Sequence, residues 1–116
     1  MARTVAVVDI GSTSIQLTIA DVCSDHITIR RKEKRIARLA DELDESGRLS
    51  TYAFNEVENA LRHFQTIAET ANVPLSVTGT ATLRAAKNRE QLLERVRSQL
   101  GLSIKLLSGG DEARLV

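Results

Sequence analysis

The chain has 116 residues, of which 42% are hydrophobic and 27% charged, with a formal net charge of +1, so it can form one globular domain at most. The balanced charge excludes wholesale disorder and an overall electrostatic preference for nucleic acid or membranes, and three aromatic residues are too few for platforms that stack bases. A lone cysteine is typical of a reducing compartment, and the apolar run before Asp9 is too short for a signal peptide or a membrane span, so we expect a cytoplasmic protein.

The first third of the sequence predicts three strands. Residues 4–10 are a β-branched run that is apolar on both faces, which is typical of a central strand buried on two sides. Residues 15–22 alternate apolar and polar side chains after a short loop, which predicts a hairpin and a half-covered strand. A third strand is expected over residues 26–36.

The third strand leads into a basic run over residues 30–38. We expect a solvated strand end, balanced by nearby acidic residues, and the alternative is a strip that docks polyanions. The acidic residues are Asp41, Glu42, Asp44 and Glu45.

Residues 39–49 have few periodic apolar positions and are predicted to be a loop. Ser50 then caps a helix whose apolar side chains recur every three or four residues up to Ala71, and Asn72-Val73-Pro74 ends it. This periodicity is the clearest helical pattern in the sequence.

Short elements alternate after the long helix, which predicts an α/β fold with a mixed sheet in the order βββαβαβα. The final helix is cut after Val116, so we expect residues 1–116 to be one lobe of a larger domain. The expected elements are a strand over 75–80, a brief helix over 81–86, a helix capped by Asn88 and ended by Gly101, a strand over 102–107, and a helix after Ser108-Gly109-Gly110.

The first candidate site is the sequence Asp9-Ile10-Gly11-Ser12-Thr13-Ser14, where a buried strand ends. Gly11 lets the backbone approach an anion, amides and hydroxyls of the next three residues can point at phosphoryl oxygens, and Asp9 can hold magnesium. Such turns also occur without any ligand. Neither the dinucleotide-binding nor the P-loop glycine pattern is present.

The second candidate is Thr78-Gly79-Thr80-Ala81-Thr82-Leu83-Arg84, in which a strand ends at a glycine. An arginine one turn into the following helix can hold two oxygens of one phosphate, and ligands of open α/β sheets bind at the carboxyl ends of strands. The alternative is an ordinary solvated arginine.

The third candidate is the strand-to-helix junction Ser108-Gly109-Gly110-Asp111-Glu112-Ala113-Arg114. Carboxylates at this point can orient water or metal, and one of them can act as a base. The alternative is helix capping, since Asp and Glu are favoured in a first turn.

Taken together, these motifs resemble the exopolyphosphatase and guanosine pentaphosphate phosphohydrolase family, which belongs to the actin, sugar kinase and Hsp70 (ribonuclease H-like) superfamily of folds. The resemblance rests on residues 5–15, 79–84 and 108–115 and extends over the whole chain. It implies the N-terminal subdomain of that fold.

The resemblance implies hydrolysis of a terminal phosphate from linear polyphosphate or guanosine pentaphosphate, with Mg²⁺ as cofactor. On matching positions, Glu112 would be the general base, Arg84 would bind a phosphoryl group and Asp9 would contribute to the metal site. The cradle for phosphate would be Gly11, Ser12, Thr13 and Ser14.

Three departures from the family pattern are visible. Thr13 stands where the family usually has Asn, and Asp111 where Glu is common. The family's second, glycine-rich phosphate loop does not occur before Val116, so we expect little turnover from this lobe without the remainder of its phosphatase domain. The alternatives are a half-domain of a superfamily kinase and a non-catalytic module that binds polyphosphate, the alarmone or a protein. An exposed sheet or helix face can also pair two copies of the chain as a homodimer.

Overall fold

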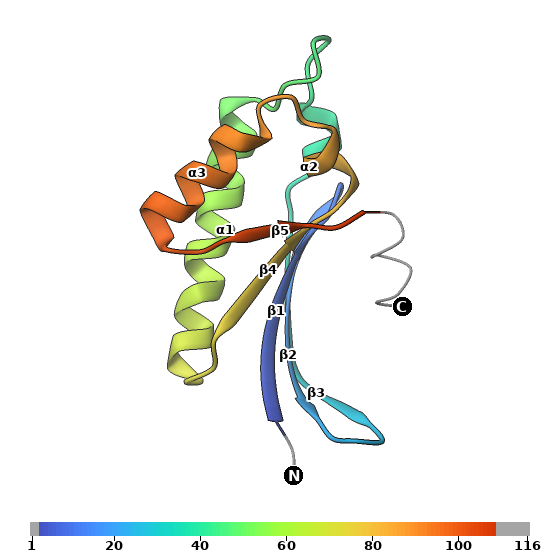
Figure 1. The fold of residues 1–116 in the computed structure, drawn as a ribbon, viewed down its shortest axis with the longest axis vertical. Coiled ribbons are helices and arrows are strands. Elements are labelled where there is room, and N and C mark those ends of the chain that lie inside the picture. The colour runs from blue at the N-terminus through green and yellow to red at the C-terminus, as the bar shows by residue number, and fades with distance from the viewer. Residues whose placement is uncertain (1–2, 109–116) are drawn as a thin grey trace.

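The computed structural model describes residues 3–108, which form an α/β fold with a five-stranded mixed sheet (Figure 1). The strands are β1 (Arg3–Ile10), β2 (Ser14–Val22), β3 (Ile27–Ile36), β4 (Leu75–Gly79) and β5 (Ile104–Leu106). The helices are α1 (Thr51–Thr70), α2 (Ala81–Ala85), α3 (Arg89–Leu100) and the 3-10 helix η1 (Leu39–Glu42).

The strand order β3-β2-β1-β4-β5 places four carboxyl ends at one edge of the sheet. Strands β1, β2 and β3 are joined as antiparallel neighbours, whereas β4 runs parallel to β1 and β5 parallel to β4. The ends of β1, β3, β4 and β5 therefore lie together. We call this the carboxyl edge.

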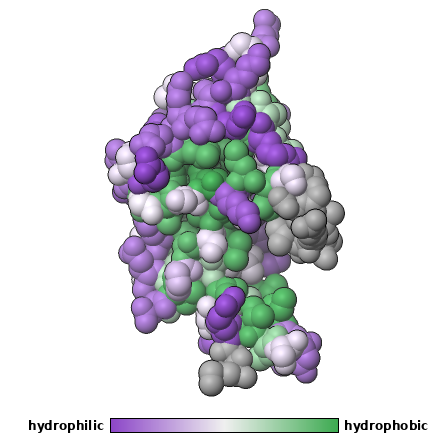
Figure 2. All heavy atoms as spheres, in the orientation of Figure 1, coloured by the Kyte–Doolittle hydropathy of each residue, from purple (hydrophilic) through white to green (hydrophobic). Residues whose placement is uncertain are grey.

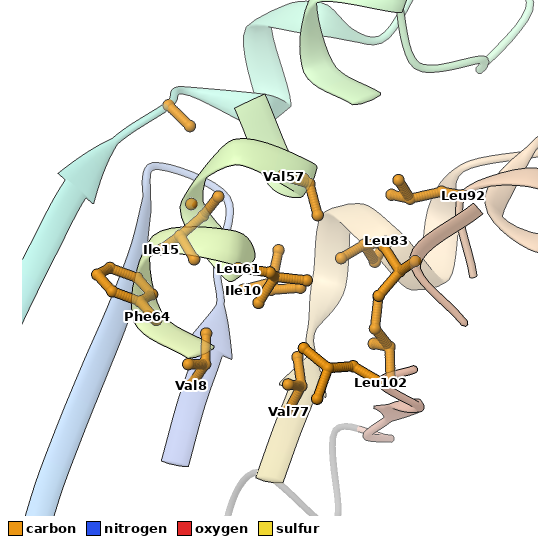
Figure 3. Packing of buried hydrophobic residues seen from close by; sticks show 14 of the residues in the cluster. Val8, Ile10, Ile15, Val57, Leu61, Phe64, Val77, Leu83, Leu92 and Leu102 are labelled. Carbon is orange, nitrogen blue, oxygen red and sulfur yellow. The ribbon is translucent and has the colours of Figure 1, made fainter. Parts of the chain in front are cut away.

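Helices α1 and α3 cover one face of the sheet and enclose an aliphatic core (Figures 1 and 3). Side chains from α1 meet those of the first hairpin, and side chains of α2 and α3 close the core over β4. The labelled core residues are Val8, Ile10, Ile15, Val57, Leu61, Phe64, Val77, Leu83, Leu92 and Leu102. Within residues 3–108, no helix combines the length and apolarity that crossing a bilayer requires.

The prediction that the first strand is buried on two sides was wrong. Ala6, Val8 and Ile10 are buried, but Val7 is 37% exposed and Asp9 is also exposed. The strand is central by pairing, yet the described helices pack on one face, and a β-branched run cannot reveal how many layers cover it. Ile27 and Ile29 are also exposed, and Figure 2 shows hydrophobic surface over the lower part of β2 and β3.

The long helix was predicted correctly. It spans Thr51–Thr70, and the Ser50 hydroxyl accepts a hydrogen bond from the Ala53 amide at 3.1 Å. The brief helix and the helix that ends at Gly101, which has φ +68°, were also correct, and the last predicted strand is shorter, at Ile104–Leu106. The helix predicted after Gly110 lies outside the described residues.

Two local predictions were wrong because they depend on distant partners. Residues 39–49 contain η1, whose first residue, Leu39, is fully buried. The Asn88 side chain does not cap α3. Instead its buried amide donates to the Leu49 carbonyl at 3.0 Å and accepts from the Leu49 amide at 2.9 Å, which fixes the loop to the α2–α3 junction.

The basic run along β3 is solvated, as predicted, but its counter-charges are different residues. Arg30 pairs with Asp21 at 3.0 Å, and Arg35 makes two hydrogen bonds with Glu56 of α1, at 3.0 and 3.1 Å. Among the described residues, ion pairs to the acidic residues of 41–45 are absent. Strand pairing and the packing of α1 select the partners of Arg30 and Arg35, whereas Arg31 pairs with its near neighbour Glu33 at 3.4 Å.

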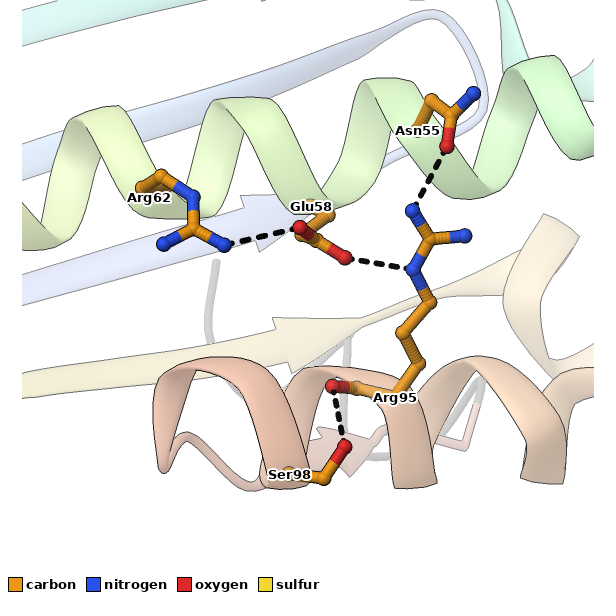
Figure 4. A network of polar contacts seen from close by, with 5 residues as sticks. All are labelled: Asn55, Glu58, Arg62, Arg95 and Ser98. Carbon is orange, nitrogen blue, oxygen red and sulfur yellow. Dashed lines mark hydrogen bonds and ion pairs between the residues drawn. The ribbon is translucent and has the colours of Figure 1, made fainter.

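Glu58 of α1 binds two arginines, and the one from α3 joins the two helices (Figure 4). Its carboxylate accepts hydrogen bonds from Arg95 of α3 at 2.6 Å and from Arg62 of α1 at 3.0 Å. These bonds, the one from Arg95 first, lower the pKa of Glu58 below its ordinary value. A depressed carboxylate pKa adds stability that is complete at neutral pH and is lost as the pH falls through the folded-state pKa.

We therefore expect Glu58→Gln to reduce the free energy of unfolding at pH 7 and to have a smaller effect at acid pH. Denaturant titrations at several pH values measure this difference. Glu90→Gln is the matched control, because the Glu90 side chain is 80% exposed. A Glu58→Gln effect that stays constant with pH would contradict the assignment.

Candidate functional site

Asp9 lies at the carboxyl edge, on the face of the sheet away from α1. It is the second-last residue of β1, and it pairs with Gln16 of β2 and with Thr78 of β4. Directly paired residues project from the same face. The Asp9 side chain thus stands in a polar row at the end of the central strand, beside the loop predicted to hold phosphate.

The loop after β1 is a tight hairpin connection. The Gly11 amide donates to the Ser14 carbonyl at 2.9 Å, and a Cβ on Gly11 would come within 3.2 Å of that oxygen. Such a contact is too close for an ordinary side chain without a local shift. Glycine therefore suits this position, where a side chain would crowd the Ser14 carbonyl.

Neighbouring segments hold this loop from both sides. On the β3 side, the Ser12 carbonyl accepts from the Ala40 amide at 3.0 Å. On the β4 side, the buried Thr82 hydroxyl donates to the Ser12 hydroxyl at 2.6 Å. The Thr80 amide and hydroxyl both donate to the Ile10 carbonyl at 3.2 Å. The structure thus brings the first two predicted motifs into direct contact.

Gly79 lets α2 sit directly on the end of β4. A Cβ at this buried residue would meet side-chain atoms of Leu83 at 3.0 Å and of Leu106 at 3.1 Å. A helix of five residues cannot be stable alone, so this packing is what fixes α2 and the arginine it carries.

Arg84 connects α2 to the end of β5. Its Nη1 donates to the Leu107 carbonyl, and Arg89 Nη1 donates to the carbonyls of Arg84 and Ala86 at 3.3 and 3.1 Å. The side chain is half-buried at the carboxyl edge and is not the freely solvated arginine of the alternative interpretation. A guanidinium has five N–H donors, so a backbone contact and an anion contact are compatible.

The third motif begins at the same edge. The Leu107 amide donates to the Gly79 carbonyl at 2.9 Å, which extends the pairing of β5 with β4 to Leu107, the residue before Ser108. Asp111, Glu112 and Arg114 lie outside the described residues. Their predicted roles therefore stay predictions from the sequence.

One cavity of the described region lies away from the carboxyl edge. A cavity of about 510 Å³ lies at the opposite end of the sheet, and its lining includes Thr4, Arg30 and Pro74. Within residues 3–108, no three His, Cys, Asp or Glu side chains are grouped to hold a metal ion. A metal site in this part of the chain would therefore rely on Asp9 and on oxygens of a bound ligand.

Sequence reasoning missed two contacts to the loop. The Thr82 hydroxyl on Ser12 joins residues 70 positions apart. The Arg38 amide donates to the Thr13 carbonyl at 2.8 Å. The sequence could have indicated the Thr82 contact, because Thr82 belongs to the second candidate motif. It could not have indicated the Arg38 contact, because the position of Arg38 depends on how β3 pairs with β2.

Comparison with known proteins gives consistent matches. Residues 18–116 match the Ppx/GppA phosphatase family. The chain is 32% identical over 111 residues to "Exopolyphosphatase 1" of Mycobacterium tuberculosis, covering 94% of the chain and 32% of that protein. It is 33% identical over 112 residues to a guanosine-5'-triphosphate,3'-diphosphate pyrophosphatase of Vibrio atlanticus, covering 96% and 22%.

Solved structures agree with these sequence matches. A Ppx/GppA family member from Aquifex aeolicus superposes with a TM-score of 0.89 at 31% identity, covering 98% of this chain and 38% of that one. An exopolyphosphatase from Cytophaga hutchinsonii has the same fold, with a TM-score of 0.89 at 23% identity, covering 98% and 37%. The chain spans about a third of the length of most of these relatives.

Proposed function

Since the chain belongs to the Ppx/GppA phosphatase family, we propose that it supplies the first phosphate-binding half of a phosphohydrolase. Its α/β fold is the actin-like fold of the family's solved structures, as the sequence predicted. The substrate class is inorganic polyphosphate or guanosine pentaphosphate, the substrates of the family. Both contain phosphoric anhydride bonds, so one reaction type serves either substrate.

The observation that carries this proposal is the hydrogen bond between Thr82 and Ser12. It joins the loop Gly11–Ser14 to the helix that carries Arg84, so the two motifs form one surface at the carboxyl edge. Loop amides, hydroxyls and a guanidinium are the groups that bind phosphoryl oxygens. An ordinary surface turn needs no such coupling to a second motif.

In the proposed reaction, this surface binds the phosphoryl group and Glu112 acts as the general base. The Glu112 carboxylate takes a proton from water as the water oxygen attacks the terminal phosphorus. The bond from that phosphorus to the bridging oxygen breaks, which releases inorganic phosphate and a substrate shortened by one phosphate. Arg84 and the loop amides stabilise the charge on the equatorial oxygens. A free glutamate side chain is ionised at neutral pH, and a carboxylate is a proton acceptor.

Mg²⁺ is the cofactor we propose, with Asp9 as the ligand from the described residues. Mg²⁺ is usually held by one or two carboxylates together with substrate phosphates and water. A single exposed carboxylate beside a phosphate-binding loop fits that pattern. Bound there, the ion would neutralise charge on the phosphoryl oxygens.

The proposal predicts that Arg84→Ala weakens binding of tripolyphosphate to the chain by about tenfold or more, because a charge-assisted contact is lost. Isothermal titration calorimetry of the 116-residue chain measures this affinity. Arg97→Ala is the matched control, since within residues 3–108 the exposed Arg97 side chain pairs with its α3 neighbour Glu94 alone. We expect the control to bind like the unmodified chain.

Two results would count against the proposal. Equal affinities for Arg84→Ala and Arg97→Ala would remove Arg84 from the site. Binding that depends on Arg84, combined with no phosphate release from polyphosphate or guanosine pentaphosphate by a protein that holds both halves of the cleft, would favour the non-catalytic module instead.

A further inference from the structure

The segment after β3 is bonded to the loop that we assign to phosphate. The amides of Ala37 and Arg38 both donate to the Thr13 carbonyl, at 3.0 and 2.8 Å, and the Ala40 amide donates to the Ser12 carbonyl at 3.0 Å. Three main-chain hydrogen bonds thus fix Arg38 next to the loop. These bonds use main-chain atoms, so they fix the position of Arg38 without involving its side chain.

Arg38 has a left-handed backbone, with φ +50° and ψ +50°. This conformation costs a residue with a Cβ roughly 1–2 kcal/mol, and glycine or asparagine adopts it more readily. It allows Ala37 and Leu39, which are 4% and 0% exposed, to be buried on either side while Arg38 stays at the surface. Packing therefore explains the backbone but not the choice of arginine. Residues held at such a cost are often found where ligands are clamped.

The charge of Arg38 has no counterpart in the described part of the chain. Arg30 and Arg35, on the strand just before it, pair with Asp21 and Glu56. Within residues 3–108, the exposed Arg38 side chain has neither an ion pair nor a hydrogen bond. An unpaired guanidinium, held beside a loop of amides and hydroxyls, suits a group with several anionic oxygens.

The sheet order places Arg38 and Arg84 on opposite sides of this loop. The loop joins β1 to β2, the end of β3 leads to Arg38, and the end of β4 leads to Arg84. All of these points lie at the carboxyl edge, and in Figure 1 the segment that follows β3 stands near α2. The hydrogen bonds of Ser12 to Ala40 and to Thr82 show the same arrangement.

We propose that Arg38 is a further phosphate-binding residue, which contacts an anionic phosphoryl group from the side of the loop opposite Arg84. The inference rests on the proposed function, because it takes the loop Gly11–Ser14 to be the phosphate site. With arginines on both sides, the edge holds two neighbouring phosphates of a chain better than a single orthophosphate. The strained arginine is then retained for binding and not for stability.

Arg38→Asn tests this directly, because asparagine accepts the left-handed backbone and removes the positive charge. We expect the variant to melt at the same temperature as the unmodified chain or higher, and to bind tripolyphosphate about tenfold more weakly in calorimetry. Arg38→Lys keeps the charge but loses the planar fork, so its affinity should lie between the two. A residue with only a structural role would not lose affinity while keeping stability.

Arg48→Ala is the matched control, since Arg48 is also exposed and its backbone amide and carbonyl bond to Asp44 and not to the loop Gly11–Ser14. It should bind tripolyphosphate like the unmodified chain. If Arg38→Asn also binds normally while Arg84→Ala binds weakly, the role of Arg38 is overturned and the proposed function stands. If the unmodified chain fails to bind tripolyphosphate, both are overturned.

Discussion

Glu112→Gln is expected to lower phosphate release by about 10²–10⁴-fold in a phosphatase that contains this lobe and its second phosphate loop. Glutamine keeps the size of the side chain but cannot accept the proton of the attacking water, and general-base catalysis is worth a factor of this order. The proposed binding surface is built by other residues. Affinity for tripolyphosphate should therefore stay within about twofold of the unmodified protein.

The assay follows inorganic phosphate released from long-chain polyphosphate and from guanosine pentaphosphate. Asp111→Asn is the matched control, because it removes the neighbouring carboxylate and should leave most of the activity. If Asp111→Asn abolishes release and Glu112→Gln does not, the base has been assigned to the wrong carboxylate. Substantial release by the 116-residue chain alone would contradict the expectation that one lobe has little turnover.

Leu83→Ala is expected to lower the free energy of unfolding by about 2–5 kcal/mol, as truncation of a buried leucine usually does. Leu83 is 1% exposed and packs against the glycine at the end of β4, and α2 is too short to persist without this contact. The same change should weaken tripolyphosphate binding, because α2 carries Arg84 and the Thr82 hydroxyl that reaches Ser12. Stability and binding should thus fall together.

Phe64→Ala provides the comparison for this effect. Phe64 is 2% exposed in the core between α1 and the first hairpin, and its truncation should cost about 3–5 kcal/mol. It does not hold α2, so tripolyphosphate affinity measured below the melting transition should be unchanged. If Phe64→Ala reduces affinity as much as Leu83→Ala does, α2 has no special role in the site.

Elements with a local pattern could be predicted from the sequence. The period of three to four residues identified α1, alternation identified β2, and turn residues marked the ends of most elements. Predictions that depend on distant partners failed. Asn88 bonds Leu49 across 39 positions, and Arg35 finds its carboxylate on α1, so neither could be assigned from neighbouring residues.

Some residues of the candidate site could likewise be predicted from the sequence, and others could not. Motifs at the ends of strands could be expected to converge, because parallel strands bring their carboxyl ends to one edge of a sheet. Asp9, the loop Gly11–Ser14 and Arg84 are found together there. The nearness of Arg38 could not be expected, since it follows from the register of β3 against β2 and from a left-handed residue that no motif marks.

We expect tripolyphosphate to bind at the carboxyl edge, and amide chemical-shift mapping of the ¹⁵N-labelled chain shows which residues it contacts. We predict that the largest shift changes fall on Gly11–Ser14, Thr80–Arg84 and Arg38, and that they saturate with one common affinity. Shift changes confined to Lys32 and Lys34 on β3, with none at the loop, would contradict binding at the carboxyl edge. They would favour a basic strip that docks polyanions through charge alone.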